Sequence, residues 1–145
     1  MRFVVYLILS LATALLFVDL DLSHARTGIQ SKKAYQGAKK LLPRMSPLRQ
    51  YDLARYAIIY DDTRFARRLL LSLKSNKKLP QDEINLMLAR SYYQDGLFQK
   101  AEKWYLKVSK SSDFYLEARE ELSWTYYRTN KKNALKAQLE TLLTP

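Results

Sequence analysis

A chain of 145 residues has the length of one domain, and its 48% hydrophobic content is enough to build a core. The absence of Cys excludes disulfides, a lipid anchor on a thiol and thiolate metal sites. Only three Gly and four Pro argue against a β-rich fold, and a formal charge of +11 indicates either an anionic partner or a well-solvated surface.

The first predicted element is a secretory signal peptide over residues 1–25. Arg2 precedes an uncharged run over residues 3–18, and the Ser-His-Ala at 23–25 places small residues where signal peptidase reads them. The alternative is an uncleaved anchor in the inner membrane. Because the run is shorter than the ~20 residues that a spanning helix needs, cleavage is favoured. We therefore expect an exported protein, periplasmic or secreted.

Beyond residue 25, helical periodicity is nearly continuous. Residues 26–47 form a basic N-terminal segment with one helix, expected over 31–42 and ended near Pro43. A helical domain over 48–145 follows, and Ser46-Pro47 is a typical cap and first-turn pair for its first helix. Its expected helices are one with the stripe Tyr51, Ala54 and Ile58, one with Phe65, Leu69 and Leu73, and four over residues 80–94, 97–110, 114–128 and 132–143.

Turn residues separate these helices. Asp62, Gly96 and Asn130 are the expected turn residues of three helix hairpins, since Gly and Asn tolerate a left-handed backbone. The stretch 111–113, Ser-Ser-Asp, is expected to cap the helix that follows it. With the helix of the basic segment, the pattern predicts seven helices, six of them in three hairpins.

The sequence also contains a repeat whose length is about that of one helix hairpin. Tyr60, Tyr93 and Tyr127 are separated by 33 and 34 residues. Residues 82–115 carry a run that resembles the signature of the tetratricopeptide repeat, with degenerate copies over 49–81 and 116–145. The matching residues are Leu88, Ala89, Tyr92, Tyr93, Gly96, Phe98, Ala101, Tyr105 and Val108. The resemblance implies an all-α fold, a short α-solenoid of about three such repeats plus an N-terminal helix.

Catalysis is not expected. The only His is His24, inside the predicted signal, so the mature chain would have neither a His- or Cys-based nucleophile nor a zinc site. A Gly-rich phosphate loop is also missing. Glu117, Glu120 and Glu121 share one helix and are interpreted as solvated. We therefore predict no enzyme, no catalytic residue, no metal and no cofactor.

The resemblance also implies a binding mode, in which the first helix of each hairpin lines a groove that receives a protein segment. The chain is then a non-catalytic scaffold or adaptor of the cell envelope. For Tyr93 and Trp124, packing against a neighbouring repeat is an equally weighted alternative. A stack this short also allows a homo-oligomer. The groove residues implied are Tyr60, Arg90, Tyr93, Gln94, Glu120, Trp124, Tyr127 and Arg128.

The alternative function is electrostatic. Residues 26–80 hold 14 basic and 3 acidic residues, so this half could bind an anionic surface such as lipid head groups or an acidic polymer. Export makes nucleic acid an unfavoured partner. Solubility alone is the simpler interpretation of the same charge. The basic face predicted for this function comprises Arg64, Arg67, Arg68, Lys74, Lys77 and Lys78.

Overall fold

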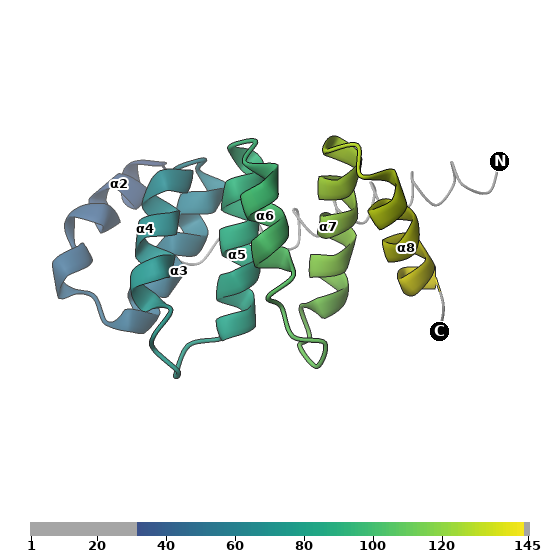
Figure 1. Ribbon diagram of the computed structural model, residues 1–145. Helices are drawn as coiled ribbons and strands as arrows, with labels where there is room; N and C mark the ends of the chain where they lie inside the picture. The colour runs from purple at the N-terminus through teal and green to yellow at the C-terminus, as the bar shows by residue number, and fades with distance from the viewer. Residues whose placement is uncertain (1–31, 144–145) are drawn as a thin grey trace. The chain divides into compact units, whose positions relative to one another are not determined.

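The computed structural model describes residues 32–143, and the predicted signal peptide lies outside them (Figure 1). The described residues form seven α-helices and one 3₁₀ helix, with no strand among them, so the all-α class is confirmed. The elements are α2 (Lys32–Lys40), η2 (Leu42–Arg44), α3 (Pro47–Ile59), α4 (Thr63–Leu73), α5 (Gln81–Gln94), α6 (Phe98–Tyr105), α7 (Tyr115–Arg128) and α8 (Lys132–Leu143).

The described residues fall into two units that are divided after Lys40. In the first unit, the described residues form α2. This helix ends at Lys40, two residues before the expected end at residue 42, and the chain then makes the 3₁₀ turn that contains Pro43. A proline has no N–H to donate and disfavours the α conformation of the residue before it, which accounts for the early end.

The second unit begins its first α-helix where the sequence indicates. The Oγ of Ser46 accepts a hydrogen bond from the backbone N–H of Arg49, with 3.5 Å between nitrogen and oxygen, and Pro47 occupies the first helical turn. This side-chain bond satisfies one of the N–H groups that a helix start leaves without an intrahelical acceptor. The predicted cap is therefore confirmed.

The same turn recurs in the three hairpins α3–α4, α5–α6 and α7–α8. Each has one residue in the left-handed region: Asp61 (φ 60°), Gly96 (φ 70°) and Asn130 (φ 56°). In the first hairpin the left-handed residue is Asp61, one position before the expected turn residue Asp62. In each turn a backbone N–H also bonds to the carbonyl five residues earlier, the pattern that closes a helix C-terminus. These bonds run from Asp62 to Ala57 (2.7 Å), from Leu97 to Tyr92 (2.9 Å) and from Lys131 to Tyr126 (2.9 Å).

Replacing Gly96 with Ala tests this backbone geometry. A Cβ at this position would meet no atom within 4 Å, so the cost is that of a left-handed backbone, about 1 kcal/mol of unfolding free energy. Thermal unfolding followed by circular dichroism measures it. Gly37 is the matched control, because it also faces open space but lies within α2. Gly37→Ala is expected not to lower Tm, and an equal loss in both variants would contradict the explanation.

One helix is shorter than its sequence pattern indicates. α6 ends at Tyr105, whereas periodicity predicted a helix to residue 110. Two polar side chains of α5 bind the backbone that follows. The Asn85 Nδ2 donates to the Lys107 carbonyl (3.1 Å), and an oxygen of Asp82 accepts from the Ser109 N–H (3.0 Å). These bonds offer the backbone an alternative to helical pairing.

The stretch 111–113 does not cap α7. The residue before that helix is Phe114, whose side chain makes no capping bond. Ser112 instead accepts a hydrogen bond from the Phe114 N–H at 3.2 Å, within the turn that precedes the helix. The serine therefore stabilises the approach to the helix, and the expectation of a cap was wrong.

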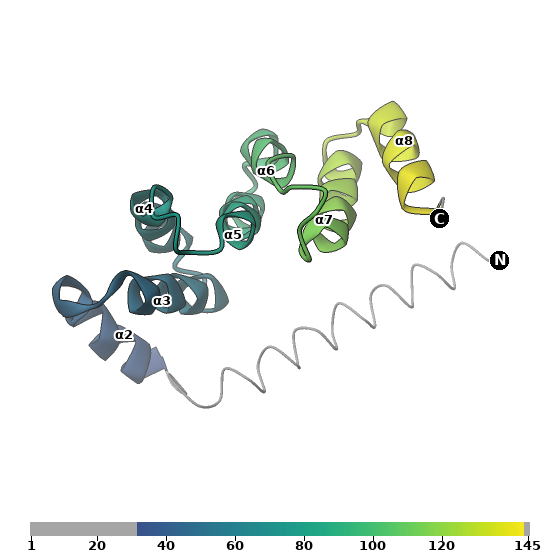
Figure 2. The ribbon, with the colours of Figure 1, turned by 90° about the horizontal axis from the view of Figure 1, so that it is seen from below.

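In the second unit each helix packs against the next along the chain, and α3 also contacts α5. Figure 2 shows α3, α5 and α7 in one row and α4, α6 and α8 in the other. Small residues lie where neighbouring helices approach, since Ala89, Ala101 and Ala118 are fully buried. A continuous core between α5, α6 and α7 contains Leu86, Ala89, Ala101, Tyr105, Val108, Ala118, Leu122 and Tyr126.

Candidate functional site

The candidate site lies on the row of α3, α5 and α7, whose neighbouring members are joined by ion pairs. The Arg55 Nε of α3 lies 3.6 Å from the Glu83 Oε1 of α5. Arg90 of α5 contacts both Glu117 and Glu121 of α7. Each ion pair joins the first helices of successive hairpins. Side-chain contacts therefore connect α3, α5 and α7 along one row.

The contact between α5 and α7 is the more extensive of the two. The Arg90 Nε donates to both oxygens of Glu121 (2.9 and 3.1 Å), and its Nη2 donates to Glu121 Oε1 (2.6 Å) and to Glu117. Burial by itself would lower the pKa of Arg90, but the charges and hydrogen bonds of Glu121 and Glu117 outweigh it and raise that pKa. Arg90 therefore stays charged and holds the two helices together.

Glu121 also lies beside the buried hydroxyl of Tyr105. Burial, and then the charge of Glu121, raise the pKa of this phenol well above its usual value. The sequence led us to interpret Glu117 and Glu121 as solvated, and the structure corrects this interpretation. Both carboxylates are held in ion pairs with Arg90.

An exposed stripe runs along α7 next to this ion cluster. Leu116, Glu120 and Trp124 are four residues apart and share one side of the helix, and Tyr127 continues it. Leu116 is 68% exposed and Tyr127 is 65% exposed, while Trp124 is partly buried. The Trp124 and Tyr127 rings meet edge to face, with 6.2 Å between centroids. The resemblance assigned the last three of these residues to the groove but did not include Leu116.

Glu120 is the carboxylate of this stripe that makes no ion pair with any described residue. Burial, and then the charges of Glu121 and Glu117, raise its pKa above the usual value for a glutamate. A cationic or hydrogen-bond-donating partner would therefore stabilise the charged form of this carboxyl group. Glu120 therefore adds a polar group to the aromatic stripe, and this group can orient a bound partner.

Four predicted groove residues belong neither to this stripe nor to the ion cluster: Tyr60, Tyr93, Gln94 and Arg128. Tyr93 packs against the core, and its ring lies edge to face with Phe98 at 5.2 Å. The Arg128 guanidinium stands 5.2 Å from the centroid of the same Phe98. Gln94 is exposed at the end of α5, and Tyr60 is partly buried just after α3. The alternative weighed for Tyr93 was packing against a neighbouring repeat, and the core that it contacts includes Leu122 and Tyr126 of α7.

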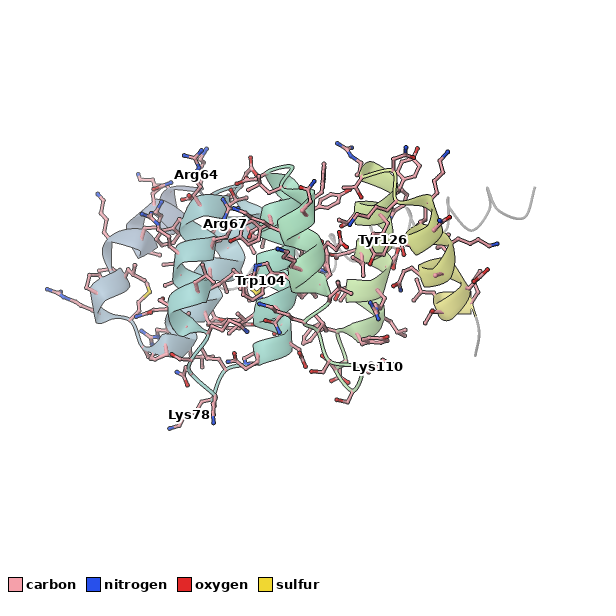
Figure 3. All side chains as sticks on the ribbon, viewed as in Figure 1. Arg64, Arg67, Lys78, Trp104, Lys110 and Tyr126 are labelled. Atoms are coloured by element: carbon pink, nitrogen blue, oxygen red, sulfur yellow. The ribbon has the colours of Figure 1, made fainter. Side chains whose placement is uncertain are left out.

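The predicted basic face does not form a single free surface. Arg67 donates to the Ser91 carbonyl (2.8 Å), pairs with Asp95 and stands 4.8 Å from the Tyr92 ring centroid. Arg64 and Arg68 are exposed around a shallow hollow that Arg67, Leu71 and Tyr92 also line. Lys74 turns toward Trp104 instead, and Lys77 and Lys78 lie in the loop after α4. Figure 3 shows Arg64 and Lys78 at opposite ends of this region.

The part of the chain that the structure describes contains no cluster of three or more His, Asp or Glu side chains suited to a metal ion. Among the same residues, no helix combines the length and the apolar character that a membrane span requires. No family model, curated protein or solved structure matches the chain.

Proposed function

We propose that the chain is a non-catalytic interaction scaffold or adaptor of the cell envelope, built as a short solenoid of tetratricopeptide-like repeats. Its partner is a protein segment that binds the row of α3, α5 and α7. The recurring left-handed turns, one per hairpin, support the repeat. The signal predicted over residues 1–25 supports the location in the envelope.

The exposed stripe of α7 is the observation on which the proposal rests. It combines two aromatic rings, one exposed leucine and one carboxylate without an ion-pair partner among the described residues. Aromatic side chains supply much of the binding energy at protein interfaces, and polar neighbours give direction. The Arg90 ion cluster joins α7 to α5 in the unbound chain, so the helix that carries the stripe is already held in position.

The experiment is affinity capture from envelope extract with the full chain and two matched double variants. Trp124→Ala/Tyr127→Ala removes the aromatic pair of the stripe. Leu71→Ala/Leu106→Ala removes two exposed apolar side chains, one on α4 and one directly after α6. We expect the first variant to bind the captured protein at least about 30-fold more weakly, since a buried anchor is often worth about 2 kcal/mol or more. The control is expected to bind as the unaltered chain does.

Salt separates this function from the electrostatic alternative. Binding through the stripe should persist at about 1 M salt, where exposed charges are screened beyond about 3 Å. Capture that is lost at this salt concentration and unchanged in Trp124→Ala/Tyr127→Ala would contradict the proposal. The alternative function, electrostatic binding through the basic N-terminal half, would then be favoured.

A further inference from the structure

The segments that follow α4 and α6 bring two lysines from different hairpins to one aromatic ring. The Nζ of Lys107 lies 3.7 Å from the centroid of Trp104, and the Nζ of Lys74 lies 5.4 Å from the same centroid. A cation over the face of an indole is attracted by the ring quadrupole. Two ammonium groups, one from each of two hairpins, therefore lie within 5.4 Å of the centroid of the Trp104 ring.

Hydrogen bonds hold this arrangement in place. The Lys74 Nζ donates to the Asn85 Oδ1 (2.7 Å), and the Nδ2 of the same asparagine donates to the Lys107 carbonyl (3.1 Å). Asn85 is only 5% exposed. Asp82 then accepts from the N–H and the Oγ of Ser109, both at 3.0 Å. The backbone that carries Lys107 is thus anchored to α5, and the Nζ of Lys74 is bound to the same asparagine.

The positive charge of this pair is not neutralised within the described part of the chain. Neither Lys74 nor Lys107 has a carboxylate within ion-pair distance there. Burial, and then the charge of Lys107, lower the pKa of Lys74, while Asp82 acts in the opposite direction. The two ammonium groups around this ring repel each other. An anion that contacts both would offset this repulsion.

Three further lysines add positive charge in the loops that follow α4 and α6. Lys77 and Lys78 lie in the α4–α5 loop, and Lys110 lies in the α6–α7 loop. Figure 3 shows Lys78 and Lys110 at the same end of the helices, below Trp104. An approaching anion would therefore meet a positive field before it reached the pair.

We propose that Lys74, Lys107 and Trp104 form a binding site for a phosphate monoester. Such a group carries a charge of about −1.5 to −2 near neutral pH and three acceptor oxygens, so one group can accept hydrogen bonds from both ammonium groups. A carboxylate, with a single charge, neutralises only one of them. The phosphate belongs to a soluble compound or to a lipid such as phosphatidic acid. This site lies apart from the α7 stripe and does not depend on the proposed protein partner.

Trp104 itself reports on the site. The chain has two tryptophans, so Trp124→Phe leaves Trp104 as the only indole. The full chain in neutral maltoside micelles is titrated with glycerol phosphate at constant ionic strength, and separately with phosphatidic acid added to the micelles. We expect a saturable change in Trp104 emission as the phosphate binds the ammonium groups beside the ring. Chloride, and phosphatidylcholine as the neutral lipid, are expected to give no such change.

Matched charge variants decide whether the response comes from this site. Lys74→Gln/Lys107→Gln is expected to bind the phosphate probe at least about tenfold more weakly. Lys132→Gln/Lys136→Gln removes the same charge from α8 and is expected to bind as the unaltered chain does. The single variant Lys107→Gln keeps the Lys74–Asn85 hydrogen bond. It gives the same test if the double variant unfolds at a lower temperature.

The two probes also identify the source of the phosphate. Saturation by glycerol phosphate indicates a soluble ligand, and saturation by phosphatidic acid alone indicates a lipid head group; each supports the site. The absence of saturation with both probes would overturn it. Equal weakening in the two double variants would also overturn it, because binding would then follow net charge alone. Loss of protein capture in Trp124→Ala/Tyr127→Ala is a separate readout and tests only the α7 stripe.

Discussion

Leu122→Ala is expected to lower the free energy of unfolding by about 3 kcal/mol. The Leu122 side chain is fully buried in the core between α5, α6 and α7. Truncation removes its apolar transfer energy and leaves a cavity, and the two terms together cost about 2–5 kcal/mol for a buried leucine. Urea unfolding followed by far-UV circular dichroism measures the loss from the shift of the midpoint.

The same helix provides the control for this prediction. Leu116 precedes Leu122 by six residues, lies on the exposed side of α7 and is 68% exposed. Leu116→Ala is expected to change stability by no more than about 0.5 kcal/mol. Equal destabilisation by the two variants would show that α7 does not pack as described. A loss confined to Leu122→Ala would leave the exposed stripe available for its proposed partner.

Helix positions in this chain follow largely from local signals that the sequence displays. Gly96 and Asn130 lie at the left-handed positions expected of them, and α8 spans the residues that its periodicity predicts. Such features depend on a residue's own backbone preference and on neighbours three or four positions away. These interactions are local, so one sequence is enough to read them.

The end of α6 could not be read in this way. Apolar spacing continues through Val108, but the backbone from Lys107 to Ser109 is bound by Asp82 and Asn85 of another helix. The acceptors and donors that stop this helix are therefore more than twenty residues away in the sequence. A window along the chain detects the periodicity and not the competing bonds, so the expected helix is too long.

The candidate surfaces show the same division. The resemblance placed Trp124 and Tyr127 in one predicted groove, and in the structure their rings meet edge to face. It could not show that Arg90 binds Glu117 and Glu121, since these partners are 27 and 31 residues away. Charged residues that a sequence presents as independent surface groups are here paired across helices. Their pairing changes which side chains remain for a partner.

The two proposed surfaces have different chemistry because the helices carry different residues. The α7 stripe is aromatic with one carboxylate, and it lies in the row that Arg90 and Arg55 join together. The lysine pair lies around Trp104 of α6, in the other row. A scaffold that binds a protein segment with one row and a phosphate group with the other could hold the two ligands at the same time.

Arg90→Met is expected to lower the free energy of unfolding by about 2 kcal/mol. The substitution keeps an apolar chain but removes every hydrogen bond to Glu117 and Glu121, leaving two carboxylates close to each other without their cation. Hydrogen bonds to charged groups are worth about 1.5–3 kcal/mol, and partial exposure of these carboxylates keeps the cost below that of a fully buried pair. Urea unfolding measures the loss.

Two further variants separate the ion cluster from general effects of losing an arginine. Arg55→Met removes the longer and more exposed contact to Glu83, and its expected cost is at most about 0.5 kcal/mol. Adding Glu117→Gln and Glu121→Gln to Arg90→Met should recover about half of the lost stability, because it removes the remaining like charges. If Arg90→Met is no less stable than Arg55→Met, the cluster does not join α7 to α5. The α7 stripe would then lack the rigid support that the proposed scaffold requires.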